Sequence, residues 1–185
     1  MAKKGIVETY SKTPAAKRVD IIINNFTIFE DLIKGEEECL YVQIRRDQED
    51  RLNEQRSDLG VRIQTSHKSD ITGDTATANA DTQAGIENGD WRLATRGLKD
   101  NVKYRKRIET LQMMRDDYTI VRGKLKGIRD DDHLFRDYLT REKTYDEMAD
   151  DLQLSNDAIR ARIYRFKMTL KENALDCMEA EKKCA

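Results

Sequence analysis

Apolar residues recur at steps of three and four near the start of the chain, at Val19, Ile22, Ile23, Phe26, Phe29, Leu32 and Ile33. This spacing places them on one face of an α-helix. Thr13 and Pro14 precede the stripe as a predicted N-cap and first helical position. Gly35 follows it as a predicted helix stop. The pattern therefore predicts a helix over 14–35, followed by a mostly polar, solvated helix over 36–57.

A second apolar stripe, of the coiled-coil type, lies further along the chain. Its members follow steps of three, four or seven and are Tyr104, Ile108, Leu111, Tyr118, Leu125 and Ile128. The stripe predicts one long helix from Trp91 to about Lys126, ended by Gly127. Its expected partner is the apolar face of the first helix, so that the two helices form an antiparallel pair.

Between these helices, residues 64–89 are rich in Thr, Ala, Asp, Asn and Gly and contain no aromatic residue. Such a composition buries too little apolar surface to offset the entropy of ordering. We therefore expect a mobile connection at about 64–89, with a short helix around 75–86. The predicted organisation is a helical, coiled-coil-like region over 1–128, a second domain over 129–175 and a tail over 176–185.

The last third of the chain predicts a helix-turn-helix. A helix is expected from about Asp131 to Arg141, and Thr144 with Glu147 has the spacing of a capping box for a short helix ending near Leu152. Residues 153–155 form a predicted tight turn, in which Ser155 caps a helix that begins at Asn156 and runs to about residue 171. Met148, Ala149 and Leu152 supply the inner face of the short helix, and Ile159, Ile163, Phe166 and Leu170 that of the long one. Two amphipathic helices joined by such a short turn form a helix-turn-helix, which is typical of DNA-binding modules.

These two predicted helices differ in the sign of their charge. The short helix carries four acidic residues and no basic one, whereas the long helix carries Arg160, Arg162, Arg165, Lys167 and Lys171 against one aspartate. A recognition helix needs cations that contact phosphates and long polar side chains that reach base edges. A second basic cluster lies at Arg92, Arg96, Lys99, Lys103, Arg105, Lys106 and Arg107. We interpret that cluster as a solvated helix face, with a secondary contact to nucleic-acid phosphates as the alternative.

Composition narrows the class of protein. The 185 residues include 37% charged and 6% aromatic side chains, one proline and nine glycines, with a net charge of −1. This favours an elongated, all-α protein without a membrane span or signal peptide, located in the cytoplasm. Three scattered cysteines (Cys39, Cys177 and Cys184) predict free thiols. The aspartates at 130–132 lack the spacing of a calcium loop. His67 and His133 are far apart in the sequence and form no nucleophile–base arrangement, so we expect no metal site, cofactor or enzymatic activity.

The stretch from Thr144 to Leu170 (TYDEMADDLQLSNDAIRARIYRFKMTL) resembles region 4 of bacterial sigma factors, which reads the promoter −35 element. It departs from that pattern at Glu142, where glycine is common, and at Asp137, where an aliphatic residue is common. The layout of the whole chain, including Val61-Arg-Ile-Gln-Thr-Ser, is similar to sigma-70 region-4-like transcriptional regulators of phages and prophages, the ArpU- and RinA-like late-gene activators. The resemblance implies a regulator that acts with host RNA polymerase. No segment resembles the promoter-melting region 2.

These observations predict a sequence-specific regulator of phage or prophage genes whose partner is double-stranded DNA. The residues expected to read base edges are Asn156, Asp157, Arg160 and Tyr164. Those expected to contact phosphates are Ser155, Arg162, Arg165 and Lys167. The apolar stripes also allow a homo-oligomer. The alternative function is a helical interaction or assembly protein whose basic helix is only solvated.

Overall fold

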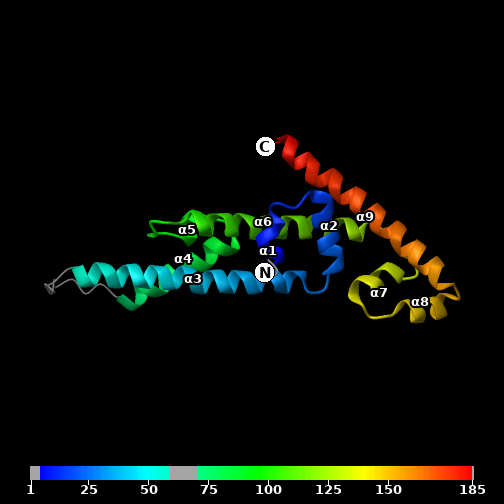
Figure 1. The fold of residues 1–185 in the computed structure, drawn as a ribbon, viewed down its shortest axis with the longest axis horizontal. Coiled ribbons are helices and arrows are strands. Elements are labelled where there is room, and N and C mark those ends of the chain that lie inside the picture. The colour runs from blue at the N-terminus through cyan, green and yellow to red at the C-terminus, as the bar shows by residue number, and fades with distance from the viewer. Residues whose placement is uncertain (1–4, 59–70, 185) are drawn as a thin grey trace. The chain divides into compact units, whose positions relative to one another are not determined.

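The computed structural model describes residues 5–58 and 71–184, and this part of the chain folds into helices joined by turns, without a strand (Figure 1). The helices are α1 (Ile6–Tyr10), α2 (Ala15–Asn24), α3 (Phe29–Asp58), α4 (Ile71–Glu87), α5 (Trp91–Ala94), α6 (Val102–Lys126), α7 (Leu134–Thr140), α8 (Tyr145–Leu152) and α9 (Asn156–Cys184). The predicted all-α fold class is confirmed. None of the described helices is long and apolar enough to cross a bilayer.

The chain divides into two compact units. The first comprises residues 1–8 and 33–113, and the second comprises residues 9–32 and 114–185. Because the division falls within α3 and α6, each of these helices contributes residues to both units. The second unit contains α7, α8 and α9 together with α2, so the C-terminal helices share a core with a segment from the start of the chain.

In the first unit, α3 and α6 run antiparallel. Arg107 of α6 donates to Glu36 through Nε (3.0 Å) and Nη2. One helical turn earlier in α6, Tyr104 and Lys103 donate to Asp47, at 2.6 and 2.9 Å. Residue numbers therefore increase along α3 in the direction in which they decrease along α6. The apolar residues buried along this pairing are Leu40, Ile44, Ile108 and Leu111.

The helix predicted over 14–35 is broken in two, so the prediction of one continuous helix from the first stripe is wrong. Asn25 ends α2 because its side-chain amide donates to the Ile21 carbonyl at 2.8 Å and its backbone leaves helical geometry. The chain turns over residues 25–28 before α3 begins at Phe29, and Gly35 lies inside α3 rather than at its end. Thr13 also does not cap α2, since its hydroxyl donates to the Thr9 carbonyl.

The expected partner of this stripe accounts for only part of its packing. Phe26 and Phe29 contact Tyr118 of α6 as expected, and Arg18 of α2 pairs with Asp117 of α6, but α9 is a second partner that was not expected. In the second unit α2 packs against α9, and Asp20 pairs with Lys171 at 2.6 Å. The buried residues of the two helices are Val19, Ile22 and Ile23 on α2 and Leu170, Ala174 and Met178 on α9. Burial of Ala174 and Met178 also explains why α9 continues through Cys184 instead of ending near residue 171 with a tail from residue 176.

The helix predicted from Trp91 to Lys126 is also interrupted, and α5 is a single turn. Asp90 caps it by accepting from the backbone N–H groups of Arg92 and Leu93. The chain then leaves the helix at Thr95, and Gly97 has φ +88°, a left-handed conformation that favours glycine. The end of α6 at Lys126, just before Gly127, is as predicted.

Residues 71–89 fold into α4 and the turn after it, where a mobile connection with a short helix was expected. Thr82, Gly85 and Ile86 are buried in the first unit, which supplies the packing that the composition did not reveal. Gly85 allows α4 and α5 to approach closely, because a Cβ there would lie 2.4 Å from the backbone nitrogen of Ala94. The part of the expected mobile stretch before Ile71, with His67, lies outside the described residues.

Candidate nucleic-acid interface

The first helix of the predicted helix-turn-helix, α8, begins with a complete capping box. The Thr144 hydroxyl accepts from the Glu147 backbone N–H at 3.3 Å, and the Thr144 backbone N–H donates to Glu147 Oε2 at 2.7 Å. The Thr144 hydroxyl also donates to Glu147 Oε2 at 2.8 Å. The hydrogen bond from the Thr144 backbone N–H, and then the one from its hydroxyl, lower the pKa of the Glu147 carboxyl. The predicted N-terminus of this helix is confirmed, and so is its end at Leu152.

The turn between α8 and α9 reverses the chain in three residues. Gln153 takes a left-handed conformation with φ 52°, and the Leu154 N–H donates to the Ala149 carbonyl at 2.9 Å. Ser155 then caps α9, because its Oγ accepts from the Ala158 N–H at 3.2 Å. Both ends of the turn are thus stabilised by hydrogen bonds within six residues, as the sequence predicted for Ser155.

Packing in the second unit holds α9 on several sides. The rings of Phe166 and Phe135 stack with centroids 5.3 Å apart, joining α9 to α7. Helix α9 also contacts α8 and α2. Its Ile159 and Ile163 side chains are buried, and so are Met148 and Ala149 of α8. The recognition-helix candidate therefore presents one fixed face to solvent.

That solvent face is centred on a stripe formed by Asp157, Ala161, Tyr164 and Met168, all exposed. Successive residues of a helix are about 100° apart, so these four positions lie on one side, opposite the buried Ile159 and Ile163. Tyr164 exposes 63% of its surface and Met168 38%. Sequence reasoning missed Ala161 and Met168, although their spacing from Asp157 and Tyr164 is a signal that could have identified them.

The predicted base-reading residues occupy different parts of this face. Asp157 and Tyr164 lie in the stripe, and their side chains make no hydrogen bond or ion pair with another described residue. Asn156 and Arg160 lie on its α8 side. The Asn156 amide donates to Asp146 Oδ1 at 2.7 Å, and the Arg160 guanidinium lies over the ring of Tyr145, 5.7 Å from its centroid.

The predicted phosphate-contacting residues differ in whether their side chains already interact with another part of the protein. Arg162 pairs with Asp132 at 2.6 Å, and the Lys167 ammonium lies 4.3 Å from the centroid of the Tyr138 ring. Arg165 is exposed, and its side chain makes no ion pair with a described residue. Arg160 and Arg165 lie on opposite edges of the stripe, so that one cation borders it on each side.

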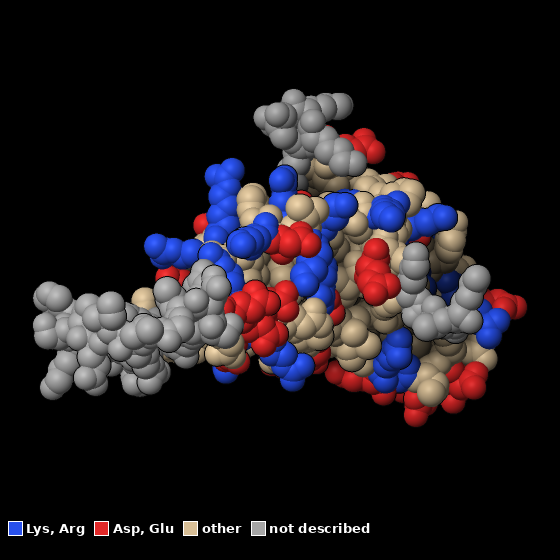
Figure 2. Space-filling view, turned by 60° about the vertical axis from the view of Figure 1, so that its left-hand side comes forward, with Lys and Arg blue, Asp and Glu red and all other residues tan. Residues whose placement is uncertain are grey.

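The other basic cluster, at 92–107, is largely paired in the first unit. Lys103 pairs with Asp47, Arg105 with Glu109 and Arg107 with Glu36, while Arg96 lies 3.9 Å from Asp81. On the face shown in Figure 2, basic and acidic side chains of the described residues are interspersed. These pairings support the interpretation of this cluster as a solvated helix face.

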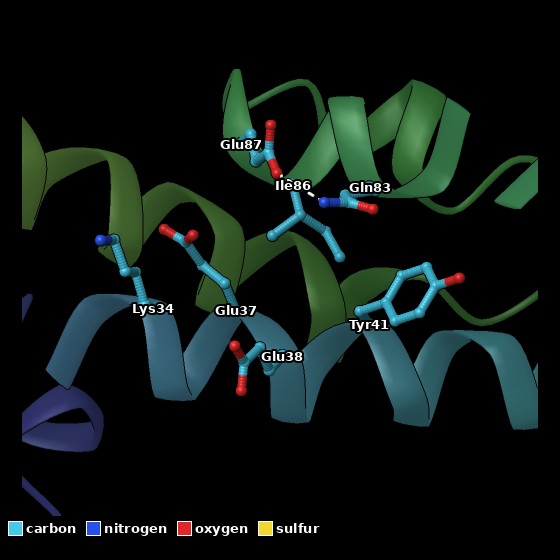
Figure 3. Close-up of a pocket in the computed structure, with 7 residues that line it drawn as sticks. All are labelled: Lys34, Glu37, Glu38, Tyr41, Gln83, Ile86 and Glu87. Carbon is cyan, nitrogen blue, oxygen red and sulfur yellow. Dashed lines mark hydrogen bonds between the residues drawn. The ribbon is translucent and has the colours of Figure 1, made fainter. Parts of the chain in front are cut away.

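A groove of about 460 Å³ between α3 and α4 has the wrong charge for nucleic acid. Its lining, shown in Figure 3, consists of Lys34, Glu37, Glu38, Tyr41, Gln83, Ile86 and Glu87. Three glutamates face one lysine there, so the groove repels phosphate. The helix-turn-helix is therefore the better candidate for a nucleic-acid interface.

The aspartates at 130–132 do not converge on one point. Asp130 accepts from the Phe135 and Arg136 backbone N–H groups and so caps α7, Asp131 pairs with Arg129, and Asp132 pairs with Arg162. The helix expected from about Asp131 starts instead at Leu134, after His133 with φ 56°. Among the described residues, no cluster of three or more His, Cys, Asp or Glu side chains is arranged to hold a metal ion.

Comparison of the chain with known protein families, with curated proteins and with solved structures finds no match.

Proposed function

We propose that the protein is a sequence-specific DNA-binding transcription regulator in which the N-terminal half of α9 enters the major groove. The observation that carries this proposal is the solvent face of α9. Asp157, Ala161 and Tyr164 form an exposed stripe flanked by Arg160 and Arg165. A helix that projects such side chains from a rigid helix-turn-helix has the form of a recognition helix.

Each part of this face has a matching chemistry in DNA. Asp157 accepts hydrogen bonds of the kind that the cytosine amino group donates, and an arginine pairs bidentately with guanine. Ala161 is small enough to let the helix approach the bases and can contact a thymine methyl group. Arg165, and Ser155 with the N-terminal amides of α9, suit phosphate oxygens. The resemblance to sigma factor region 4 supports the same function, acting in the bacterial cytoplasm together with host RNA polymerase.

The proposal is tested by selection from a pool of random duplexes with the full-length protein. We expect the wild type to enrich one motif, and the variant Arg160→Ala/Tyr164→Ala to enrich none. Arg46→Ala is the matched control, since Arg46 is exposed on α3 in the first unit, and it should enrich the wild-type motif. Failure of the wild type to enrich any motif would contradict the proposal.

A second candidate function is a helical interaction protein, and the Tyr164–Met168 pair favours it. Both side chains are exposed, at 63% and 38%, and lie one turn apart on α9, where a partner helix could cover them. The two functions differ in salt dependence, because phosphate contacts make affinity fall steeply as salt rises. Binding of DNA that weakens linearly on a log–log plot against salt supports the first function, and no DNA binding at low salt supports the second.

A further inference from the structure

The first unit contains a groove whose lining is rich in arginine. It lies between α3, α4 and the turn after α5, has a volume of about 290 Å³ and includes Arg45, Gln48, Arg51, Thr75, Asn79 and Arg96. One carboxylate, that of Glu49, belongs to the same lining. The charge of this groove is therefore opposite to that of the groove in Figure 3, which also lies between α3 and α4.

Arg51 is the least satisfied cation of this groove. Its Nε is shielded from solvent and has no hydrogen-bond acceptor, and the side chain makes no ion pair with a described residue. Gly97 permits this position, because a Cβ there would lie 3.0 Å from Nη1 of Arg51. A partly desolvated guanidinium that makes no ion pair within the described part of the chain is costly to the folded protein, and an anion in the groove would relieve that cost.

The other two arginines of the groove flank Arg51, and each has one acidic neighbour. Arg45 pairs with Glu49 at 2.8 Å on the exposed side of α3, and Arg96 lies 3.9 Å from Asp81. The wall between them is fixed, since Gln48 Nε2 donates to the Arg96 carbonyl at 3.3 Å. Arg51 also borders a neighbouring groove whose carboxylates are those of Asp47, Asp50, Glu54 and Asp100, but none of these four pairs with it.

We propose that this groove binds a small phosphate-bearing molecule, with Arg51 as the central ligand and Arg45 and Arg96 as flanking cations. Guanidinium groups suit phosphate because their planar fork donates two parallel hydrogen bonds to its oxygens. Gln48, Thr75 and Asn79 add neutral polar groups around the charged centre. This site is independent of the proposed DNA interface, since its residues all belong to the first unit.

The test is isothermal titration of inorganic phosphate into the full-length protein at constant low ionic strength, with chloride as the balancing anion. We expect saturable binding at one site. Arg51→Gln should weaken it about tenfold or more, the size expected for loss of a charge-assisted pair. Arg51→Lys should bind between the two, because it keeps the charge and loses the fork. Arg46→Gln, which removes an exposed arginine of α3 outside the groove, should bind as the wild type does.

Each other outcome overturns the proposal. If phosphate gives no saturable heat, or if Arg51→Gln and Arg46→Gln change binding equally, the groove is not a phosphate site. Circular dichroism of each variant shows whether it is folded, and Arg51→Lys gives the answer if Arg51→Gln does not fold. If a short DNA duplex displaces phosphate equally well from the wild type and from Arg160→Ala, the groove takes nucleic-acid backbone and not a small molecule.

Discussion

The Arg18 guanidinium Nε lies 2.7 Å from Oδ2 of Asp117, and both side chains are buried in the second unit. Arg18 Nη2 donates to Oδ1 at 3.3 Å, and the Tyr10 hydroxyl donates to Oδ2 at 2.8 Å. Burial raises the pKa of the Asp117 carboxyl, while the contacts with Tyr10 and Arg18 oppose that rise. One carboxylate of α6 thus holds the end of α1 and the start of α2, the helix on which α9 packs.

Asp117→Ala should lower the free energy of unfolding by about 3–5 kcal/mol, because it leaves the Arg18 charge buried without a partner. Urea denaturation followed by circular dichroism measures the loss. Tyr10→Phe/Arg18→Met/Asp117→Leu should recover most of it, since apolar side chains of similar size carry no desolvation cost and Phe leaves no buried hydroxyl without an acceptor. Asp176→Ala, at an exposed position of α9, should change stability by less than about 0.5 kcal/mol. An equally small effect of Asp117→Ala would show that the ion pair does not hold α2.

Phe29 and Phe26 should differ in their contribution to stability. Phe29 is fully buried and stacks on Tyr118 with ring centroids 5.5 Å apart. Phe26 is half-buried in the turn between α2 and α3, with its ring 5.7 Å from that of Tyr118. Phe29→Ala should therefore cost about 3–5 kcal/mol and Phe26→Ala about 1–2 kcal/mol, as measured by urea denaturation. The reverse order would mean that the turn, and not the start of α3, anchors this core.

Arg160 and Arg165 should affect DNA binding in different ways. Arg160→Ala should lose about 1–3 kcal/mol on the selected site and flatten discrimination at one base pair. Arg165→Ala should weaken binding to all sequences alike and reduce the salt slope by about one, as expected for a phosphate contact. Fluorescence anisotropy on selected and scrambled duplexes at several salt concentrations separates these effects.

Two outcomes of that experiment would change the assignment. If Arg160→Ala weakens both duplexes equally, base reading passes to Asn156 or Tyr164. If neither variant changes DNA binding, the helix-turn-helix is a protein-contact module and the interaction function is preferred.

The capping box should make the second unit sensitive to acid. Because hydrogen bonds from Thr144 lower the pKa of Glu147 below its ordinary value of 4.5, this contribution to stability is present above that value. It is lost as the pH falls through the lowered pKa. Urea midpoints measured between about pH 6 and pH 3 should therefore fall on acidification, and less steeply for Glu147→Gln.

The matched control is Glu142→Gln, an exposed glutamate whose side chain makes no hydrogen bond or ion pair with a described residue. Its midpoints should follow those of the wild type across the pH range. If Glu147→Gln and Glu142→Gln behave alike, the capping box does not contribute to the acid sensitivity.

The local features of the candidate interface could be predicted from the sequence. The Thr144–Glu147 capping box and the Ser155 cap each depend on hydrogen bonds between residues three apart. The spacing of Ile159, Ile163 and Leu170 likewise depends on the period of a helix, and all three are buried. Short-range geometry of this kind is set by residue type and spacing, so an ordered list of residues contains the information.

Long-range features of the same interface could not be predicted. Arg162 and Lys167 were expected to be available for phosphates, yet Arg162 pairs with Asp132, 30 residues away, and Lys167 lies over Tyr138. Outside the interface, the break at Asn25 was also missed, although its hydrogen bond to Ile21 is local, because the stripe from Val19 to Ile33 keeps its helical spacing across it. No local signal reveals which of several acidic or aromatic side chains a cation meets after folding.

By itself, the sequence determined that the protein is helical, where both helices of the helix-turn-helix begin, where the first of them ends, and which of their faces are apolar. Only the tertiary structure decided that α2 packs on α9, with Asp20 beside Lys171 from 151 positions away. It also decided that Arg160 and Arg165, at the edges of the exposed stripe, make no ion pair with a described residue. The physical reason is that an apolar stripe specifies burial but not the surface that buries it. Burial is non-directional, so the choice of partner depends on how all the helices of the unit pack together.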